Sequence, residues 1–141
     1  MPLTTHIDIV SAESEIFSGT AVMVFAPAEM GEVGIAARHA PMVTRLKPGE
    51  VRVETLEGEY QHIYVSGGIL EVQPHKVTVL ADTATRAADI DEAAALQAKE
   101  RAEKAMQDKS AKMDYARAQA EFAEAAAQLK AIEAMRRRAK R

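Results

Sequence analysis

The feature that most constrains this chain is an abrupt change of composition near residue 87. All 7 glycines and all 5 prolines lie within the first 74 residues, whereas 19 of the last 55 residues are alanine. Glycine and proline allow the chain to reverse direction, and alanine is the best helix-forming residue. The sequence therefore predicts two domains, a turn-rich body over residues 1–86 and a helical region over residues 87–141.

Short segments rich in β-branched residues fill the body. They cover residues 4–10, 20–26, 42–47, 50–55, 60–66, 69–72 and 76–80. Turn signals such as Ser18-Gly19, Pro48-Gly49 and Gly67-Gly68 separate several of these segments. Regularly spaced short strands and turns predict a compact all-β sandwich or barrel.

Two helices are expected in the second region, over residues 90–106 and 114–138, with a turn near residues 108–112. Asp89 lies at the expected N-cap, and Glu92 follows three residues later, as in a capping box. The second helix carries a seam with alternating spacings of three and four residues, formed by Tyr115, Ala118, Phe122, Ala125, Leu129 and Ile132. The first helix offers a smooth stripe of Ala95, Ala98, Ala102 and Ala105. We expect an antiparallel hairpin in which this stripe packs against the larger side chains, giving an α+β fold.

The alanine content also bears on how firmly the hairpin is held. Helices rich in alanine keep much of their shape when undocked, yet each buried methylene contributes only about 0.8 kcal/mol. Such a hairpin is suited to move as a unit between two packings. A plain stable hairpin is the simpler alternative, and the sequence leaves both open.

The charge of the chain is divided between its two parts. The net charge is −3, but residues 1–86 carry 6 basic and 11 acidic side chains, whereas residues 87–141 carry 12 and 10. Residues 130–141 alone hold six basic side chains and one acidic side chain. This basic end is consistent with a solvated helix end or with an acidic protein partner. Nucleic acid is disfavoured because no aromatic residues are interleaved with the basic ones.

The chemistry of known enzyme sites is missing from the sequence. It contains no cysteine, no phosphate-binding loop and no metalloprotease or nucleophile-elbow motif. Four histidines, at positions 6, 39, 62 and 75, are far apart, so strand or turn positions are favoured over a metal site. No secretory signal and no apolar run of about 18 residues are present, and we expect a soluble protein. His39 stands out because it lies in a predicted recognition loop.

Several stretches resemble a known family, in order and over essentially the whole chain. The most specific is Ile-Tyr-Val-Ser-Gly-Gly at residues 63–68, followed by Glu-Val at 71–72. Further matches lie at residues 8–13, 17–19, 31–35, 39–41, 46–49, 77–82, 89–92 and 114–116. Together they resemble the epsilon subunit of bacterial F-type ATP synthase.

This resemblance implies a β-sandwich of about ten strands, a C-terminal helical hairpin and a non-catalytic role in the rotor. The β domain would bind the gamma subunit and the c-ring, with Glu32, His39 and Pro41 at those interfaces and the first two on loops. The hairpin would extend along gamma and inhibit ATP hydrolysis by the alpha/beta catalytic head. Its contacts to acidic residues of a beta subunit would be Lys130, Arg136, Arg137 and Arg138. The protein would be peripheral, on the cytoplasmic face of the inner membrane, without a cofactor and attached only through the complex.

One departure from the family concerns ATP. Members that bind ATP on this subunit begin the first helix with Ile/Leu-Asp-x-x-Arg-Ala, but here alanine stands at position 94 in place of arginine. Asp91 and Arg101 are the remaining matches, while Glu124 and Gln128 stand where cations would help hold phosphates. Loss of a guanidinium removes charge-assisted phosphate contacts. The sequence therefore predicts weak or absent ATP binding.

Two other classes of function remain for comparison. A free-standing β-sandwich adaptor would bind a protein partner through its helical hairpin. An enzyme would need a nucleophile–base pair or a metal cluster, and the sequence offers neither at recognisable spacing.

Overall fold

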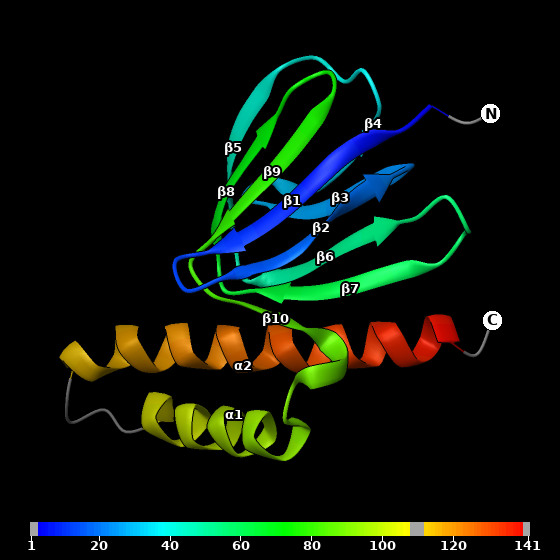
Figure 1. Cartoon of the computed structure of the whole chain (residues 1–141). Coiled ribbons are helices and arrows are strands. Elements are labelled where there is room, and N and C mark those ends of the chain that lie inside the picture. Colours follow the sequence, from blue (N-terminus) through cyan, green and yellow to red (C-terminus); the bar gives the residue numbers. More distant parts are fainter. Residues whose placement is uncertain (1–2, 108–111, 140–141) are drawn as a thin grey trace.

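The computed structural model describes residues 3–107 and 112–139 (Figure 1). Ten strands precede a short 3-10 helix, η1 (Ala87–Asp89), and two helices, α1 (Glu92–Gln107) and α2 (Lys112–Ala139). The strands are β1 (Thr5–Ser11), β2 (Glu15–Ala21), β3 (Met23–Ala28), β4 (Gly31–Ala36), β5 (Met42–Leu46), β6 (Gly49–Glu54), β7 (Tyr60–Val65), β8 (Gly68–Val72), β9 (Lys76–Ala81) and β10 (Ala84–Arg86). The predicted α+β fold, with a ten-stranded β domain and a helical hairpin, is confirmed.

The strands form one continuous sheet that curls into two layers. The order is β10-β7-β6-β3-β5-β8-β9-β1-β2, with β4 paired to β3 on a side branch. Most neighbours are antiparallel, but β1 and β9 run parallel. The layers join where β3 meets β5 through the single pair Ala28 and Leu46. At the open side Arg86 donates a hydrogen bond to the carbonyl oxygen of Ile16 at 2.8 Å, which brings β10 next to β2.

The curled sheet encloses its own hydrophobic core. Alternate side chains on each strand point inward, and the buried set includes Ile7, Ile9, Val24, Ile35, Val51, Val53, Ile63, Val65, Leu70, Val72, Val77 and Val79. None of these residues belongs to the helices. Strand β7 shows the alternation clearly, since Ile63 and Val65 enter this core while Tyr64 points out toward α2. The β domain therefore needs no helical side chain to complete its interior.

The pair Gly67 and Gly68 marks the tight passage from β7 to β8. Both residues have positive φ angles, of 130° and 140°, which residues with a side chain rarely adopt. A Cβ atom on Gly68 would overlap the carbonyl oxygen of Leu80 on the neighbouring strand. The Ser-Gly-Gly motif is thus required both by the backbone angles and by the close approach of β9.

Strand boundaries differ from those that residue patterns predicted. The segment 20–26 was expected to be one strand, but the chain bends at Val22 and divides it between β2 and β3. Patterns also missed β4 and β10 as strands. Two glycines, Gly31 and Gly34, lower the strand propensity of β4, and β10 has only three residues. Hydrogen bonds to β3 and β7, which local propensity does not register, hold these strands in place.

The predicted N-cap at Asp89 is wrong. Residues Ala87–Asp89 form η1, and Ile90 is extended, with φ −73° and ψ 131°. Asp91 caps α1 instead, because its Oδ1 accepts a hydrogen bond from the backbone N–H of Ala94 at 3.1 Å. Ile90 packs beside Tyr64 and Ala87, and this apolar anchor delays the start of the helix. The expected turn at 108–112 lies mostly outside the described residues, and α2 begins at Lys112.

The hairpin seam is made of smaller residues than expected. Ala95 and Ala102 of α1 are buried, as are Ala118, Ala125 and Ile132 of α2. The larger residues flank this seam, since Tyr115 is 47% exposed and Phe122 and Leu129 are only half-buried. Ala105 is exposed, so the predicted packing of an alanine stripe against large side chains is only partly correct.

Capping by Asp91 gives a test that separates hydrogen bonding from charge. Asp91→Ala removes the acceptor and should lower the free energy of unfolding of the helical region by about 0.5–2 kcal/mol. Asp91→Asn keeps an oxygen acceptor and should lower the free energy of unfolding by only about a few tenths of a kcal/mol. Urea titration followed by circular dichroism at 222 nm measures both variants, with Asp89→Ala as control. Equal losses for Asp91→Asn and Asp91→Ala would show that the charge, not the cap, stabilises α1.

Candidate functional site

Helix α2 lies between α1 and the β domain and contacts both (Figure 1). The side facing the sheet rests on β6, β7 and η1, where Tyr64, Ala87 and Ala131 are buried. Ile90, Ala127 and Met135 pack around them and remain partly exposed. Tyr64 is the one large side chain that this contact buries completely among the described residues. Docking of the hairpin therefore depends on a small apolar area, as the alanine content predicted.

The hydroxyl group of Tyr64 is buried without a hydrogen-bond partner among the described residues. Burial, followed by the negative charge of nearby Glu124, raises the pKa of Tyr64 well above its ordinary value of 10.0. Gln128 also lies close to the phenol and has the smaller, opposite effect of lowering its pKa. Tyr64 thus fills the docking contact and places its hydroxyl group out of reach of water, beside Glu124 and Gln128 of α2.

The basic end of α2 is turned onto groups of the same chain. Arg136 forms a bidentate ion pair with Glu92 at the start of α1, with Nη2–Oε2 at 2.6 Å and Nη1–Oε1 at 3.1 Å. This pair lowers the pKa of Glu92 and raises that of Arg136, through hydrogen bonding first and charge second. Arg138 places its guanidinium carbon 5.1 Å from the ring centre of Tyr60 on β7, a cation–π contact.

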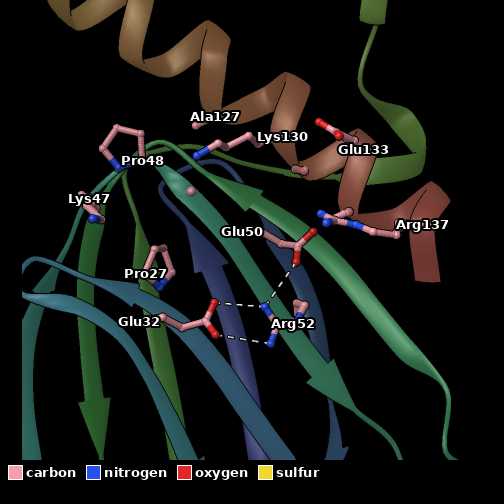
Figure 2. Close-up of a pocket in the computed structure, with 13 residues that line it drawn as sticks. Pro27, Glu32, Lys47, Pro48, Glu50, Arg52, Ala127, Lys130, Glu133 and Arg137 are labelled. Atoms are coloured by element: carbon pink, nitrogen blue, oxygen red, sulfur yellow. Dashed lines mark hydrogen bonds and ion pairs between the residues drawn. The ribbon is translucent and has the colours of Figure 1, made fainter.

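Lys130 and Arg137 line a cleft of about 570 Å³ between α2 and the β domain (Figure 2). Its opposite wall holds Glu32, Glu50 and Arg52 from β4 and β6. The described part of the chain shows no ion pair for either cation. All four predicted inhibitory residues lie on one end of α2, and among the described residues Arg136 is the one that forms an ion pair.

A charged network on the wall of this cleft escaped the sequence analysis. Arg52 donates hydrogen bonds to both carboxylate oxygens of Glu32, at 3.0 and 3.4 Å, and lies 3.8 Å from Glu50 (Figure 2). Its guanidinium also stacks on the ring of Phe25 at 4.4 Å. Glu50 in turn contacts Nδ1 of His62 at 3.1 Å. Register between β4, β3, β6 and β7 brings these residues together, and sequence spacing alone gives no signal of it.

Glu32 and His39 lie at opposite ends of β4. Glu32 is the second residue of this strand, not a loop residue as the resemblance implied, and it lines the cleft between α2 and the β domain. His39 and Pro41 belong to the loop between β4 and β5, at the end of the β domain away from the helices (Figure 1). Arg38 N–H donates to the carbonyl oxygen of Pro74 at 2.9 Å and holds this loop against the β8–β9 turn. The structure therefore does not bring Glu32 and His39 together.

The two ATP-binding candidates are also separated. Asp91 caps the start of α1, and Arg101 lies ten residues further along, about 15 Å at 1.5 Å per residue. Arg101 lines a groove between the helices with Glu121, Glu124 and Gln128. Two carboxylates against one guanidinium give this groove a negative balance, which opposes phosphate binding.

The outer face of β5, β8 and β9 exposes an apolar patch formed by Val43, Ile69 and Leu80. Their exposed fractions are 71%, 43% and 47%. Ile69 pairs with Leu80, and Val43 pairs with Glu71, two residues beyond Ile69 on the same face. Apolar side chains gathered on an exposed sheet face are typical of a protein interface.

A serine, a histidine and an aspartate meet beside this patch without forming a catalytic triad. Ser18 Oγ donates to Asp8 Oδ1 at 2.6 Å, and His6 Nε2 contacts the same oxygen at 2.8 Å. In a triad the two ring nitrogens of histidine contact the acid and the serine separately, whereas here Nε2 faces both groups. The hydrogen bond from Ser18 is the main reason that the pKa of Asp8 is lowered, and Lys76 adds to it at 3.3 Å. This cluster is a surface ion network.

No metal site is evident in the described ranges, where no three potential ligands among His, Asp and Glu gather. His6 and His62 lie on different strands, β1 and β7, and the four histidines do not converge. None of the described helices is long and apolar enough to cross a membrane.

Comparison with known proteins matches both parts of the chain. The β-sandwich domain of the ATP synthase delta/epsilon chain matches residues 4–87, and the long α-helix domain of the same chain matches residues 88–133. The ATP synthase epsilon chain of Nitrosococcus oceani is 71% identical over 138 residues, covering 98% of this chain and 99% of the relative. That of Alkalilimnicola ehrlichii is 62% identical with the same coverage.

These matches show that the chain belongs to the ATP synthase delta/epsilon family, with bacterial epsilon chains among its relatives. It is therefore a non-catalytic subunit, and membership favours this role over a free-standing adaptor or an enzyme.

Solved structures share the fold at low sequence identity. A chain of the Euglena gracilis mitochondrial ATP synthase, in a structure of its OSCP, F1 and c-ring, has a TM-score of 0.82 at 20% identity. The match covers 96% of this chain and 82% of that one. A chain from the central stalk and c-ring of the Tetrahymena thermophila enzyme has a TM-score of 0.62 at 12% identity, with 92% and 97% covered.

The raised pKa of Tyr64 gives a pH-dependent prediction for docking. A tyrosine whose pKa is higher in the folded state stabilises that state fully below the ordinary value, and this stabilisation is lost as pH rises through the folded value. The docked hairpin should therefore weaken above pH 10.0. Absorbance at 295 nm, taken as wild type minus Tyr64→Phe, isolates the ionisation of Tyr64 and should show its step above pH 10.0.

Glu124 supplies the matched control. Glu124→Gln removes the nearby charge and should move the Tyr64 step toward lower pH, whereas Glu121→Gln, one turn earlier on α2, should leave it in place. A Tyr64 step at or below pH 10.0 in the wild type would contradict the buried position of this phenol.

Proposed function

We propose that this chain is the central-stalk subunit that connects the gamma subunit to the c-ring of F-type ATP synthase and inhibits ATP hydrolysis through its helical hairpin. The observation that supports inhibition most directly is the basic end of α2, which is docked by a small contact and is held by groups of its own chain. The solved structures of similar fold come from assemblies that include a central stalk and a c-ring. Through that complex the protein would lie peripherally at the cytoplasmic face of the bacterial inner membrane.

The β domain offers separate contact areas for its rotor partners. Since Glu32 and His39 lie at opposite ends of β4, one small interface cannot include both. We assign one area to Glu32 with the neighbouring β3–β4 turn, where Met30 is 98% exposed. His39 and Pro41 form the second area, and the apolar patch of Val43, Ile69 and Leu80 extends the surface available to the gamma subunit.

The hairpin supplies the regulatory element. Its core contact is formed by Tyr64 against alanine and one methionine, so undocking exposes little apolar surface and leaves the β core intact. Once released, Lys130, Arg136, Arg137 and Arg138 would be available to acidic residues of a catalytic beta subunit. Charge complementarity of this kind determines orientation and partner choice.

Removal of the hairpin tests the proposed inhibition. A chain ending at residue 88 should still assemble into the complex, because no core residue of the β domain lies beyond that point. ATP hydrolysis by the whole enzyme should rise by about fivefold or more, the lower end of typical allosteric coupling. A steady-state hydrolysis assay on purified complexes measures this change, and an unchanged rate would refute inhibition by the hairpin.

A second variant tests whether the inhibition depends on the positive charge of α2. Replacement of Lys130, Arg136, Arg137 and Arg138 by glutamine keeps the helices but removes the four cations. It should raise hydrolysis to nearly the rate of the truncated chain. A rate equal to wild type would place the inhibitory contact elsewhere on the hairpin.

ATP should not bind this subunit tightly, because the groove beside Arg101 is acidic and residue 94 is alanine. Calorimetric titration of the full chain should show no binding at micromolar ATP. Ala94→Arg restores the missing guanidinium and should tighten binding about tenfold or more, the effect of one charged hydrogen bond. Micromolar affinity in the wild type would contradict this proposal, and Ala94→Gln controls for side-chain size.

A further inference from the structure

We infer that Glu92 is an internal competitor that masks Arg136, so that the basic end of α2 is released in two steps. Undocking of the hairpin from the β domain frees Lys130, Arg137 and Arg138, whereas Arg136 is freed only when α1 and α2 separate. This inference rests on the proposed inhibitory role of these cations and names the residue that regulates one of them.

The geometry of the Glu92–Arg136 pair supports the competition. Two parallel N–H···O bonds, of 2.6 and 3.1 Å, join the guanidinium to the carboxylate. This fork is the arrangement that an arginine makes with a carboxylate on a partner protein. A carboxylate of the partner would have to displace Glu92 to form the same bonds. Both side chains are about half exposed, at 48% and 60%, so a partner's carboxylate can reach the pair but must compete with Glu92 for as long as the two helices stay together.

The pair differs from the other cationic contacts in the elements that it joins. Glu92 is the first residue of α1, and Arg136 lies in the last turn of α2, so this bond closes the open end of the hairpin. Arg138 instead contacts Tyr60 of β7, and Lys130 and Arg137 face the cleft against β6. A hairpin that moves away as a rigid unit therefore breaks the contacts of these three cations with the β domain. It preserves the Glu92–Arg136 pair, because both partners move with the hairpin.

The two motions therefore expose different numbers of cations. After rigid undocking, the described end of α2 presents Lys130, Arg137 and Arg138 as cations without an ion pair, together with Arg136 neutralised by Glu92. Separation of the helices adds the fourth cation and leaves Glu92 behind on α1. The affinity of the extended element for an acidic surface would then depend on how far the two helices have come apart.

Binding of a short polyglutamate peptide to the full-length chain tests the masking directly. Glu92→Gln cannot hold Arg136 by charge and should bind the peptide a few-fold more tightly than wild type at low salt, with the difference shrinking at high salt. Glu100→Gln on the same helix removes an equal charge at a position without an ion pair among the described residues. It should bind like wild type. Equal affinities for Glu92→Gln and Glu100→Gln would overturn the inference.

A double-mutant cycle separates masking from any loss of helix stability at the start of α1. In the Arg136→Gln background, Glu92→Gln should no longer strengthen peptide binding, because the masked cation is absent. A gain that persists in that background would show that Glu92 acts through the helix and not through Arg136.

Hydrolysis by the whole enzyme distinguishes this inference from the proposed function. Glu92→Gln should inhibit hydrolysis more strongly than Glu100→Gln. If the truncated chain leaves hydrolysis unchanged, the inhibitory function fails while the peptide experiment still decides the masking. If truncation raises hydrolysis but Glu92→Gln matches Glu100→Gln in both assays, the inhibitory function stands and the masking fails.

Discussion

The structure depends on the core that the curled sheet builds from its own strands, whose alternate side chains point inward. Closure beside β10 and β2 and the passage at Gly67 and Gly68 hold this core without a helical side chain. Because this core is independent of the helices, the way in which the helices are attached is free to vary. The helices can be attached by a small contact between Tyr64 and alanine because they contribute no side chain to the core of the β domain. One short chain thus combines a β domain that has its own core with a helical hairpin that is attached by a small contact.

Charge is distributed to match this division. The acidic network of Glu32, Glu50 and their partner Arg52 belongs to the rigid domain, whereas the dense cations belong to the end of α2. Docking brings opposite charges close without pairing most of them, so the electrostatic attraction is general and remains sensitive to salt. The bidentate ion pair of Glu92 with Arg136 joins the two helices of the hairpin and does not cross the contact with the sheet.

The sequence predicted the fold class and the hairpin because composition and periodicity are local properties. The change near residue 87 and the heptad spacing are readable without a structure. Three kinds of feature were not. Strands such as β4 depend on hydrogen bonds to a distant partner, and its two glycines weaken the local signal. The N-cap moved from Asp89 to Asp91 because Ile90 packs on Tyr64, a tertiary contact. The Arg52 network and the Glu92–Arg136 pair follow from register and helix packing, and the sequence alone contains no pattern for them.

Helix α2 has alanine on two opposite faces, with Ala118 and Ala125 toward α1 and Ala127 and Ala131 toward the sheet. At these four positions only a methyl group separates the helical backbone from each neighbouring layer, whereas Ile132 and Met135 reach further. A larger residue on one face would push α1 away from α2, and a larger residue on the other face would push α2 away from the sheet. In each case the opposite contact would stay in place. Evolution can thus loosen the hairpin from the sheet without loosening its two helices from each other, or the reverse, by changing a single side chain.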